Sequence, residues 1–209
     1  LDKNNFRITT QSGCTLMSIK EEAKKNNLYF PLSLPSMASC TIGGNIATNA
    51  GGSSVLKYGM TRDLVLGIEV VLPNGEILNC LREIKKDNRS YDLKHIFIGS
   101  EGTLGIITSS VLKLFPLPKK KATAIVAIKN LNQVINFFRY MNICQHEQLT
   151  SFELNSNLGL KFIETSYPEI TIPFGNKHPW YVIFELSFLK NIDADKEIQF
   201  ILEESLKKN

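Results

Sequence analysis

The sequence contains no Gly-x-Gly-x-x-Gly segment and no Gly-x-x-x-x-Gly-Lys-Ser/Thr segment. These two absences argue against a nicotinamide-binding Rossmann protein and against a phosphate-loop NTPase. A Cys-x-x-Cys pair and a His-x-x-x-His spacing are also missing, which argues against a zinc site. No apolar run reaches the ~18 residues that a membrane-spanning helix needs, so no membrane span is expected.

A strong charge of either sign is lacking as well. The 24 lysines and arginines exceed the 20 aspartates and glutamates by only four, and the basic residues are scattered. This balance argues against a nucleic-acid partner, because basic and aromatic residues do not alternate along one stripe. A mildly basic chain suits a phosphate-bearing cofactor or a carboxylate substrate.

Cysteine and histidine are both sparse. The four cysteines are far apart in sequence, and we expect free, mostly buried thiols of a reducing compartment, hence a cytoplasmic protein. The three histidines are expected to be surface or hydrogen-bonded polar residues, and no metal site is predicted. These residues are Cys14, Cys40, Cys80, Cys144, His95, His146 and His178.

Glycine, in contrast, is concentrated in two stretches. In the first, CTIGGNIATNAGG at 40–52, Thr41 suits a helix N-cap and 42–47 a short helix. Exposed N–H groups at such a helix start bind anions, and bare glycines let a diphosphate approach the backbone. Gly51 and Gly52 would then end the helix in a left-handed conformation. A tight crossing against a neighbouring element explains the same glycines equally well.

The second bare stretch is GSEGTLG at 99–105. Both stretches lie beside predicted strands, and together they suit one extended ligand. The expected strands are 6–11, 64–72, 76–79, 104–114, 124–128, 149–154 and 180–187. The expected helices are 15–25, 42–47, 91–97, 131–141 and 194–206.

Prolines and lysines at 115–121 suggest a domain boundary, because two prolines stop a strand and a lysine run prefers solvent. The alternative is a surface loop inside one domain. We therefore predict a first domain at 1–115, a linker at 116–121 and a second domain at 122–209. Strands alternate with helices in the second domain, which indicates a compact α+β or α/β unit.

Several motifs occur in a fixed order: FPLSL, SCTIGGNIATNAGG, YG, LPNGEIL and YDLKHIFIGSEGTLGIIT. This order resembles the FAD-linked oxidases of the vanillyl-alcohol oxidase superfamily, which carry a PCMH-type FAD-binding domain. D-2-hydroxyglutarate dehydrogenases are most similar, with D-lactate dehydrogenases and glycolate oxidase flavoprotein subunits as near neighbours. The resemblance covers about 11–114 and is weaker from 122 onward. It implies an α+β fold: the second half of the FAD-binding domain, followed by part of an α/β cap domain.

The resemblance implies FAD as the cofactor, lying along both glycine-rich stretches, and it identifies no catalytic residue. The implied cofactor-binding residues are Pro31, Ser36, Ser39, Thr41, Gly43, Gly44, Asn45, Ala47, Gly102 and Ile106. Pro35 and Ser90 stand where the family usually has glycine. The family's first glycine-rich loop is expected before residue 1 and its histidine-rich segment after residue 209, so a central fragment is expected.

The implied activity is FAD-dependent oxidation of a D-2-hydroxy acid, of the D-2-hydroxyglutarate, D-lactate or glycolate class, to the 2-oxo acid. Electrons would pass from the flavin to an acceptor protein or a quinone. The alternative is a non-catalytic fragment or split gene product, which folds but lacks the complete FAD and substrate sites.

Overall fold

The computed structural model describes residues 1–207 except 85, 87, 90, 172 and 175–177, so Ser90 lies outside the described residues. The chain divides into two compact units, Leu1–Leu117 and Pro118–Asn209. Only Leu117 to Lys119 lie between the last strand of the first unit and the first strand of the second. The expected linker at 116–121 is therefore shorter in the structure, because Pro116 and Lys120 already belong to strands.

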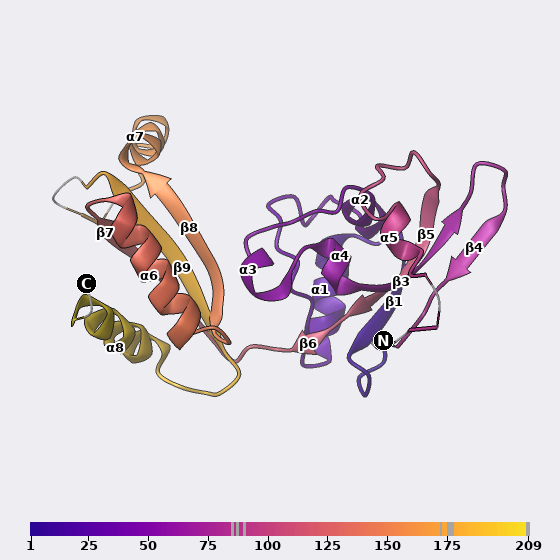
Figure 1. Ribbon diagram of the computed structural model, residues 1–209, viewed down its shortest axis with the longest axis horizontal. Helices are drawn as coiled ribbons and strands as arrows, with labels where there is room; N and C mark the ends of the chain where they lie inside the picture. Colours follow the sequence, from indigo (N-terminus) through magenta and orange to yellow (C-terminus); the bar gives the residue numbers. More distant parts are fainter. Residues whose placement is uncertain (85, 87, 90, 172, 175–177, 208–209) are drawn as a thin grey trace. The chain divides into compact units, whose positions relative to one another are not determined.

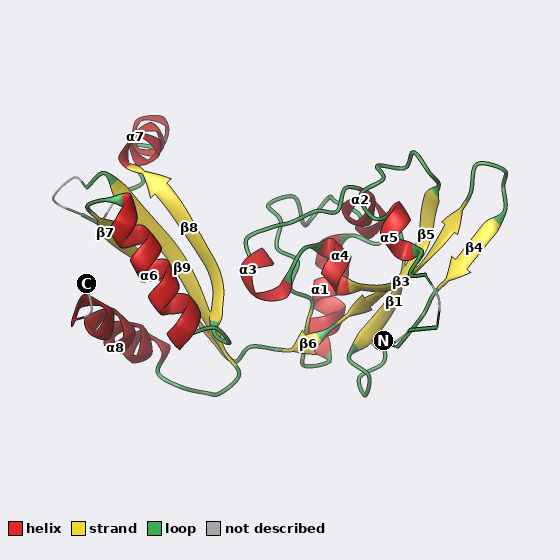
Figure 2. Ribbon diagram, in the orientation of Figure 1, coloured by secondary structure: helices red, strands yellow, loops and turns green. Residues whose placement is uncertain are grey.

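The first unit combines a sheet with short helices (Figures 1 and 2). Its strands are β1 (Arg7–Gln11), β2 (Leu28–Tyr29), β3 (Val65–Val71), β4 (Ile77–Cys80), β5 (Ile106–Lys113) and β6 (Phe115–Pro116). Its helices are α1 (Leu16–Lys25), α2 (Ile42–Ala47), α3 (Val55–Tyr58), α4 (Thr61–Leu64) and α5 (Lys94–Phe97). The main sheet has the order β1-β5-β3-β4 and is antiparallel throughout, while β2 pairs with β6.

Local sequence explains the two elements that build this unit's core. Leu16, Ile19 and Ala23 recur at helical spacing and are all buried on α1, whose N-cap is Thr15. The predicted turn at 73–75 joins β3 to β4, where Gly75 has a φ of 85°. The core of this unit joins the buried face of α1 to buried residues of the sheet and of the shorter helices, such as Ile42 and Ile46 of α2.

In its described residues, the second unit has a three-stranded sheet and three helices. Its elements are β7 (Lys120–Ile128), α6 (Leu131–Cys144), β8 (Leu149–Ser156), α7 (Asn157–Ser166), β9 (Trp180–Phe188) and α8 (Ala194–Lys207). Both neighbours of the central strand β9 run antiparallel to it. The α/β expectation for this unit is thus wrong: β7 and β8 run parallel, but β9 separates them.

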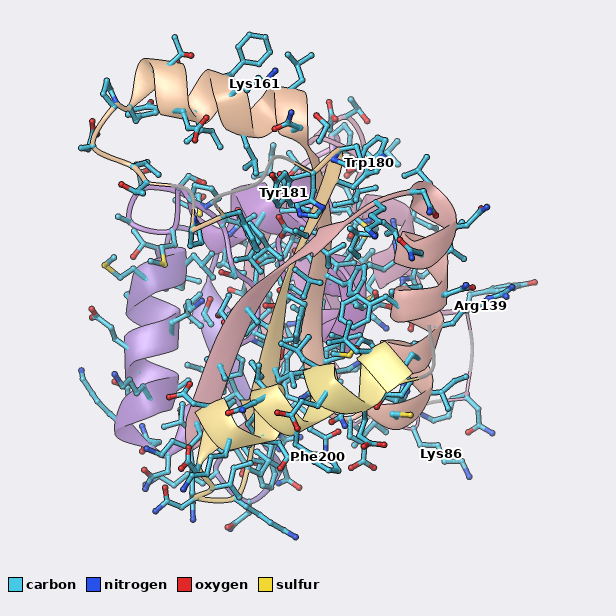
Figure 3. All side chains as sticks on the ribbon, turned by 90° about the vertical axis from the view of Figure 1, so that its left-hand side faces the viewer. Lys86, Arg139, Lys161, Trp180, Tyr181 and Phe200 are labelled. Atoms are coloured by element: carbon cyan, nitrogen blue, oxygen red, sulfur yellow. The ribbon has the colours of Figure 1, made fainter. Side chains whose placement is uncertain are left out.

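Helices α6 and α8 pack on the same face of this sheet. The alternate residues Val182, Phe184 and Leu186 of β9 share one core with Phe137 of α6 and Ile201 of α8. Figure 3 views this unit with α8 in front of the sheet and with the Arg139 side chain pointing away from it. The sequence pattern missed α7, in which Leu160 is the buried residue and the apolar signal is short.

Candidate functional site

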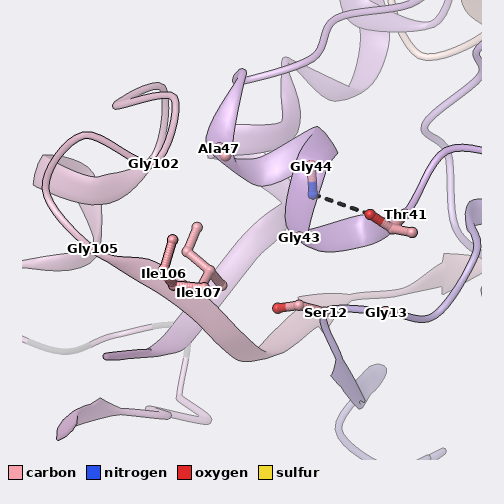
Figure 4. Close-up of a pocket in the computed structure, with 10 residues that line it drawn as sticks. All are labelled: Ser12, Gly13, Thr41, Gly43, Gly44, Ala47, Gly102, Gly105, Ile106 and Ile107. Carbon is pink, nitrogen blue, oxygen red and sulfur yellow. Dashed lines mark hydrogen bonds between the residues drawn. The ribbon is translucent and has the colours of Figure 1, made fainter. Parts of the chain in front are cut away.

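The two glycine-rich stretches meet at a cleft of about 360 Å³ in the first unit (Figure 4). We call it the glycine-walled cleft; it is lined by Ser12, Gly13, Thr41, Gly43, Gly44, Ala47, Gly102, Gly105, Ile106 and Ile107. Helix α2 supplies one wall, and the start of β5 with its preceding loop supplies the other. The lining includes no charged side chain.

Helix α2 begins as the sequence predicts, with Thr41 as its N-cap. The N–H of Gly44 donates to Thr41 Oγ1 at 3.4 Å. The Ile42 N–H donates to the carbonyl of Cys14, and the Gly43 N–H to that of Ser12, each at 2.9 Å. The first-turn donors that such helices usually leave unpaired are therefore already paired within the chain.

This pairing corrects the expected mechanism of anion binding at the start of α2. A helix start binds an anion through free N–H groups, and here the loop before α1 occupies two of them. The bond from Gly44 to Thr41 is long and hence weak. Of the three N–H groups at the start of α2, that of Gly44 can therefore most easily leave its present acceptor and donate to a ligand.

The end of α2 lies where the sequence predicts, but the residue in left-handed conformation after it is not the predicted glycine. The helix ends at Ala47, and the left-handed residue that follows is Asn49, with a φ of 48°. Asparagine adopts this conformation more readily than most residues other than glycine. Gly52 has a φ of 120°, and an added Cβ would lie 2.3 Å from the Ser33 carbonyl oxygen. Position 52 thus requires glycine because the backbone at Ser33 passes close to it, beyond the end of the helix.

Gly43 and Gly44 lie next to each other but have different reasons to be glycine. A Cβ on Gly43 would lie 2.5 Å from the Cβ of Ser12, a distance at which the backbone must shift. A Cβ on Gly44 would meet only Thr41 Oγ1, at 3.4 Å. Close packing against Ser12 therefore explains why position 43 is glycine. At position 44, glycine leaves the wall of the cleft without a side chain.

The opposite wall is tied to the end of α2 by backbone hydrogen bonds. The Gly99 N–H donates to the Ile46 carbonyl at 3.1 Å, and the Glu101 N–H to the Ala47 carbonyl at 2.9 Å. Gly102 has a φ of 78° and no atom within 4 Å of an added Cβ. Beside it, Ile106 is 64% exposed. The wall thus offers bare backbone next to an exposed aliphatic surface.

Six of the ten predicted cofactor residues line this cleft: Thr41, Gly43, Gly44, Ala47, Gly102 and Ile106. The other four do not. Pro31 is buried, and Ser36 and Ser39 lie in an exposed loop. Asn45 is also buried, and its Nδ2 faces the sulfur of Cys40 at 3.6 Å.

Pro35, which stands where the resemblance leads us to expect glycine, fits its surroundings. It is the second residue of a turn in which the Met37 N–H donates to the Leu34 carbonyl at 3.2 Å. Proline is favoured at this turn position because its φ is already fixed near the required value.

Sequence reasoning missed Ser12, Gly13, Gly105 and Ile107 as lining residues. Gly105 ends the second stretch, and Ile107 follows it within the motif YDLKHIFIGSEGTLGIIT, so the full extent of that motif was the available signal. Ser12 and Gly13 follow β1 and come next to α2 only through the fold. The Ser12 hydroxyl is buried and has no hydrogen-bond partner.

The described residues contain neither a metal-binding group of side chains nor a helix that could span a membrane. Among them, no group of three or more His, Cys, Asp or Glu side chains could hold a metal ion. In the same residues, no helix is both long and apolar enough to cross a membrane. All four cysteines are free thiols, and Cys144 is exposed.

Comparisons with known proteins show which proteins the chain is similar to. Residues 1–81 match the model of an FAD binding domain. The chain is 39% identical over 178 residues to the mitochondrial D-2-hydroxyglutarate dehydrogenase of Bos taurus, covering 85% of this chain and 32% of that protein. It is 42% identical over 132 residues to the glycolate oxidase subunit GlcD of Bacillus subtilis, covering 63% and 28% respectively.

A solved structure of alkyldihydroxyacetonephosphate synthase matches with a TM-score of 0.74 and 21% identity, covering 98% of this chain and 39% of that one. At this identity the match shows the fold alone. The chain spans about a third of the length of these relatives. Over this segment the chain is similar to D-2-hydroxyglutarate dehydrogenases and to a glycolate oxidase subunit, and its first 81 residues match an FAD binding domain.

Proposed function

We propose, from this homology, that the protein to which the chain belongs is an FAD-dependent enzyme that oxidises a D-2-hydroxy acid to the 2-oxo acid. The observation that carries the proposal is the glycine-walled cleft, where two bare stretches about fifty residues apart in sequence meet. The first of these stretches lies within residues 1–81, which match an FAD binding domain. Bound FAD supplies the redox chemistry by accepting two electrons from the hydroxy acid.

The residues of the cleft fit part of FAD. Gly44 and Gly102 leave room against both walls, and the exposed face of Ile106 suits a flat ring or an aliphatic chain. Because no cation lines the cleft, nothing here neutralises a diphosphate. We therefore propose that the cleft receives an uncharged portion of FAD, oriented by Thr41 Oγ1 and the Gly44 N–H.

We propose D-2-hydroxyglutarate as the substrate class, with D-lactate and glycolate as the alternatives. The matched bovine protein is named a D-2-hydroxyglutarate dehydrogenase, and the matched Bacillus protein a glycolate oxidase subunit. A separate acceptor protein or a quinone would reoxidise the flavin. The first unit would hold FAD, and the second would form part of the substrate domain.

The test is the absorption spectrum of the purified 209-residue chain after incubation with FAD and gel filtration. Retained flavin that is bleached anaerobically by D-2-hydroxyglutarate supports the proposal, and D-lactate and glycolate tested in parallel rank the substrates. Retained flavin that no hydroxy acid bleaches supports FAD binding but not oxidation by this segment. A folded chain that retains no FAD supports the alternative of a non-catalytic fragment.

A further inference from the structure

The turn at 11–14 forms a third wall of the glycine-walled cleft, beside the two walls that the glycine-rich stretches supply. The Cys14 N–H donates to the Gln11 carbonyl at 3.1 Å, so Ser12 and Gly13 are the two central residues of the turn. Both residues line the cleft. In Figure 4 the Ser12 hydroxyl points toward the side of the cleft where Ile106 and Ile107 lie.

The backbone of Ser12 is held by two hydrogen bonds. Its N–H donates to the Thr108 carbonyl of β5, and its carbonyl accepts from the Gly43 N–H of α2, each at 2.9 Å. These bonds fix the turn to both neighbouring elements without any help from the side chain. An alanine at position 12 would keep both bonds, so the turn itself gives no reason for a serine.

The hydroxyl of Ser12, in contrast, is unpaired. Its Oγ is buried and has no hydrogen-bond partner among the described residues. Such a hydroxyl is unfavourable because it has lost its hydrogen bonds to water and gained none in return. Rotation of the side chain toward a ligand therefore breaks no hydrogen bond. A hydroxyl can both donate and accept, so it suits a neutral partner of either kind.

Gly13 also lacks a structural reason to be glycine. Unlike Gly75 in the turn between β3 and β4, it does not adopt the left-handed conformation. No atom lies within 4 Å of an added Cβ. Glycine at such a position costs conformational entropy that alanine would avoid. Position 13 therefore leaves the third wall bare although the fold does not require it.

Ser110 shows that an unpaired hydroxyl by itself does not mark a ligand contact. Its Oγ is also buried and without a partner in the described part of the chain, and the residue is 0% exposed within β5. Ser110 does not line the cleft. Ser12 differs because it combines an unpaired hydroxyl with a place in the cleft lining.

We propose that the Ser12 hydroxyl forms a hydrogen bond to a neutral oxygen of the bound flavin, either a ribityl hydroxyl or a ring carbonyl. Gly13 leaves space for the same group. This inference rests on the proposed function, which assigns an uncharged portion of FAD to this cleft. A hydroxyl in a cleft lined by no charged side chain matches a neutral oxygen, whereas a diphosphate needs cations.

The experiment measures binding of FAD to the 209-residue chain by the change in flavin fluorescence at equilibrium. Ser12→Ala should weaken binding about three- to tenfold, the range expected for one lost hydrogen bond. Gly13→Val should weaken it about tenfold or more, because its side chain takes up space at the third wall. Unchanged FAD binding by either variant contradicts the contact at that residue.

Thermal unfolding without flavin separates this role from a structural one. The Ser12→Ala chain should melt at the same temperature as the unchanged chain or higher, since both backbone bonds remain and an unpaired hydroxyl is removed. A lower melting temperature, with flavin loss only in proportion to unfolding, would show a structural role and reject the inference.

Ser110→Ala is the matched control, because it removes the other buried and unpaired hydroxyl of the same unit. It should leave FAD binding within about twofold. Equal weakening by Ser110→Ala and Ser12→Ala would mean that both changes act through the sheet, and would reject the contact at Ser12.

Two smaller flavins identify the group that Ser12 contacts. Riboflavin carries the ring and the ribityl chain without phosphates, and lumiflavin carries the ring alone. If Ser12→Ala weakens the binding of riboflavin but not of lumiflavin, the partner is a ribityl hydroxyl; if it weakens both, the partner is a ring carbonyl. Equal binding of all three flavins by the Ser12→Ala and unchanged chains overturns the inference and leaves the proposed function intact. An unchanged chain that binds no flavin overturns both.

Discussion

At the scale of single residues, Gly43 and Gly44 separate structural from ligand-related uses of glycine. We predict that Gly44→Val removes FAD from the protein while leaving its fold intact. A Cβ at this position would meet only Thr41 Oγ1, at 3.4 Å, so the first atom of the valine side chain does not clash with the chain. Flavin content and thermal unfolding, measured on the same preparations, test this prediction.

Gly43→Ala is the matched variant with the opposite expected order of effects. Its methyl group would overlap the Cβ of Ser12, at 2.5 Å, so α2 must move away from the loop before α1. Overpacking of this kind costs about 1–3 kcal/mol of unfolding free energy. We expect a lower melting temperature, with flavin loss only in proportion to unfolding. If the Gly44→Val protein keeps stoichiometric FAD, the wall formed by Gly44 does not approach the cofactor.

At the scale of elements, α2 is short and depends on its cap. Thr41→Ala should lower the unfolding free energy by about 0.5–1 kcal/mol, at the low end for a lost N-cap because the bond is long. Thr41→Ser keeps the hydroxyl and should restore most of the loss. Urea unfolding measures both. If both variants are equally less stable than the unchanged chain, the methyl group of Thr41, and not its hydroxyl, stabilises this position.

Arg62 connects two other elements of the first unit. Its guanidinium donates to the carbonyls of His95 and Ile98, so it holds α5 against α4 just before the 99–105 stretch. Arg62→Lys keeps the charge but loses the planar fork that reaches both carbonyls. We expect faster amide hydrogen exchange at Gly99 and Glu101, whose N–H groups bond to α2. Unchanged exchange there would show that Arg62 does not support the cleft wall.

At the scale of the whole chain, the division between Leu117 and Pro118 predicts two independent folding units. Each has its own hydrophobic core, one around α1 and one around β9. The separate fragments 1–117 and 118–209 should therefore each show a cooperative thermal transition by circular dichroism. A fragment 1–117 that unfolds without a transition would mean that the first unit needs the second for its stability.

The sequence alone determined features that depend on near neighbours in the chain. The extent of α2 after Thr41, the hairpin of β3 and β4, and the buried face of α1 all follow from capping, turn and spacing rules. The ordered motifs also located both stretches that meet at the glycine-walled cleft. They did so because the backbone of both stretches must be free of large side chains, and the glycines and other small residues are visible in the sequence itself.

Only the tertiary structure decided what depends on residues far apart in sequence. Ser12, about thirty residues before α2, accepts a hydrogen bond from a first-turn N–H with its carbonyl, and its Cβ explains Gly43. The helix start is therefore not an open anion site. The order β7-β9-β8 made the second unit antiparallel, although its alternating elements suggested otherwise. A second cleft, with Arg62, Arg82, Lys94 and Lys113 in its lining, combines four segments of the first unit. No local pattern records these juxtapositions, because packing and backbone pairing of distant segments create them.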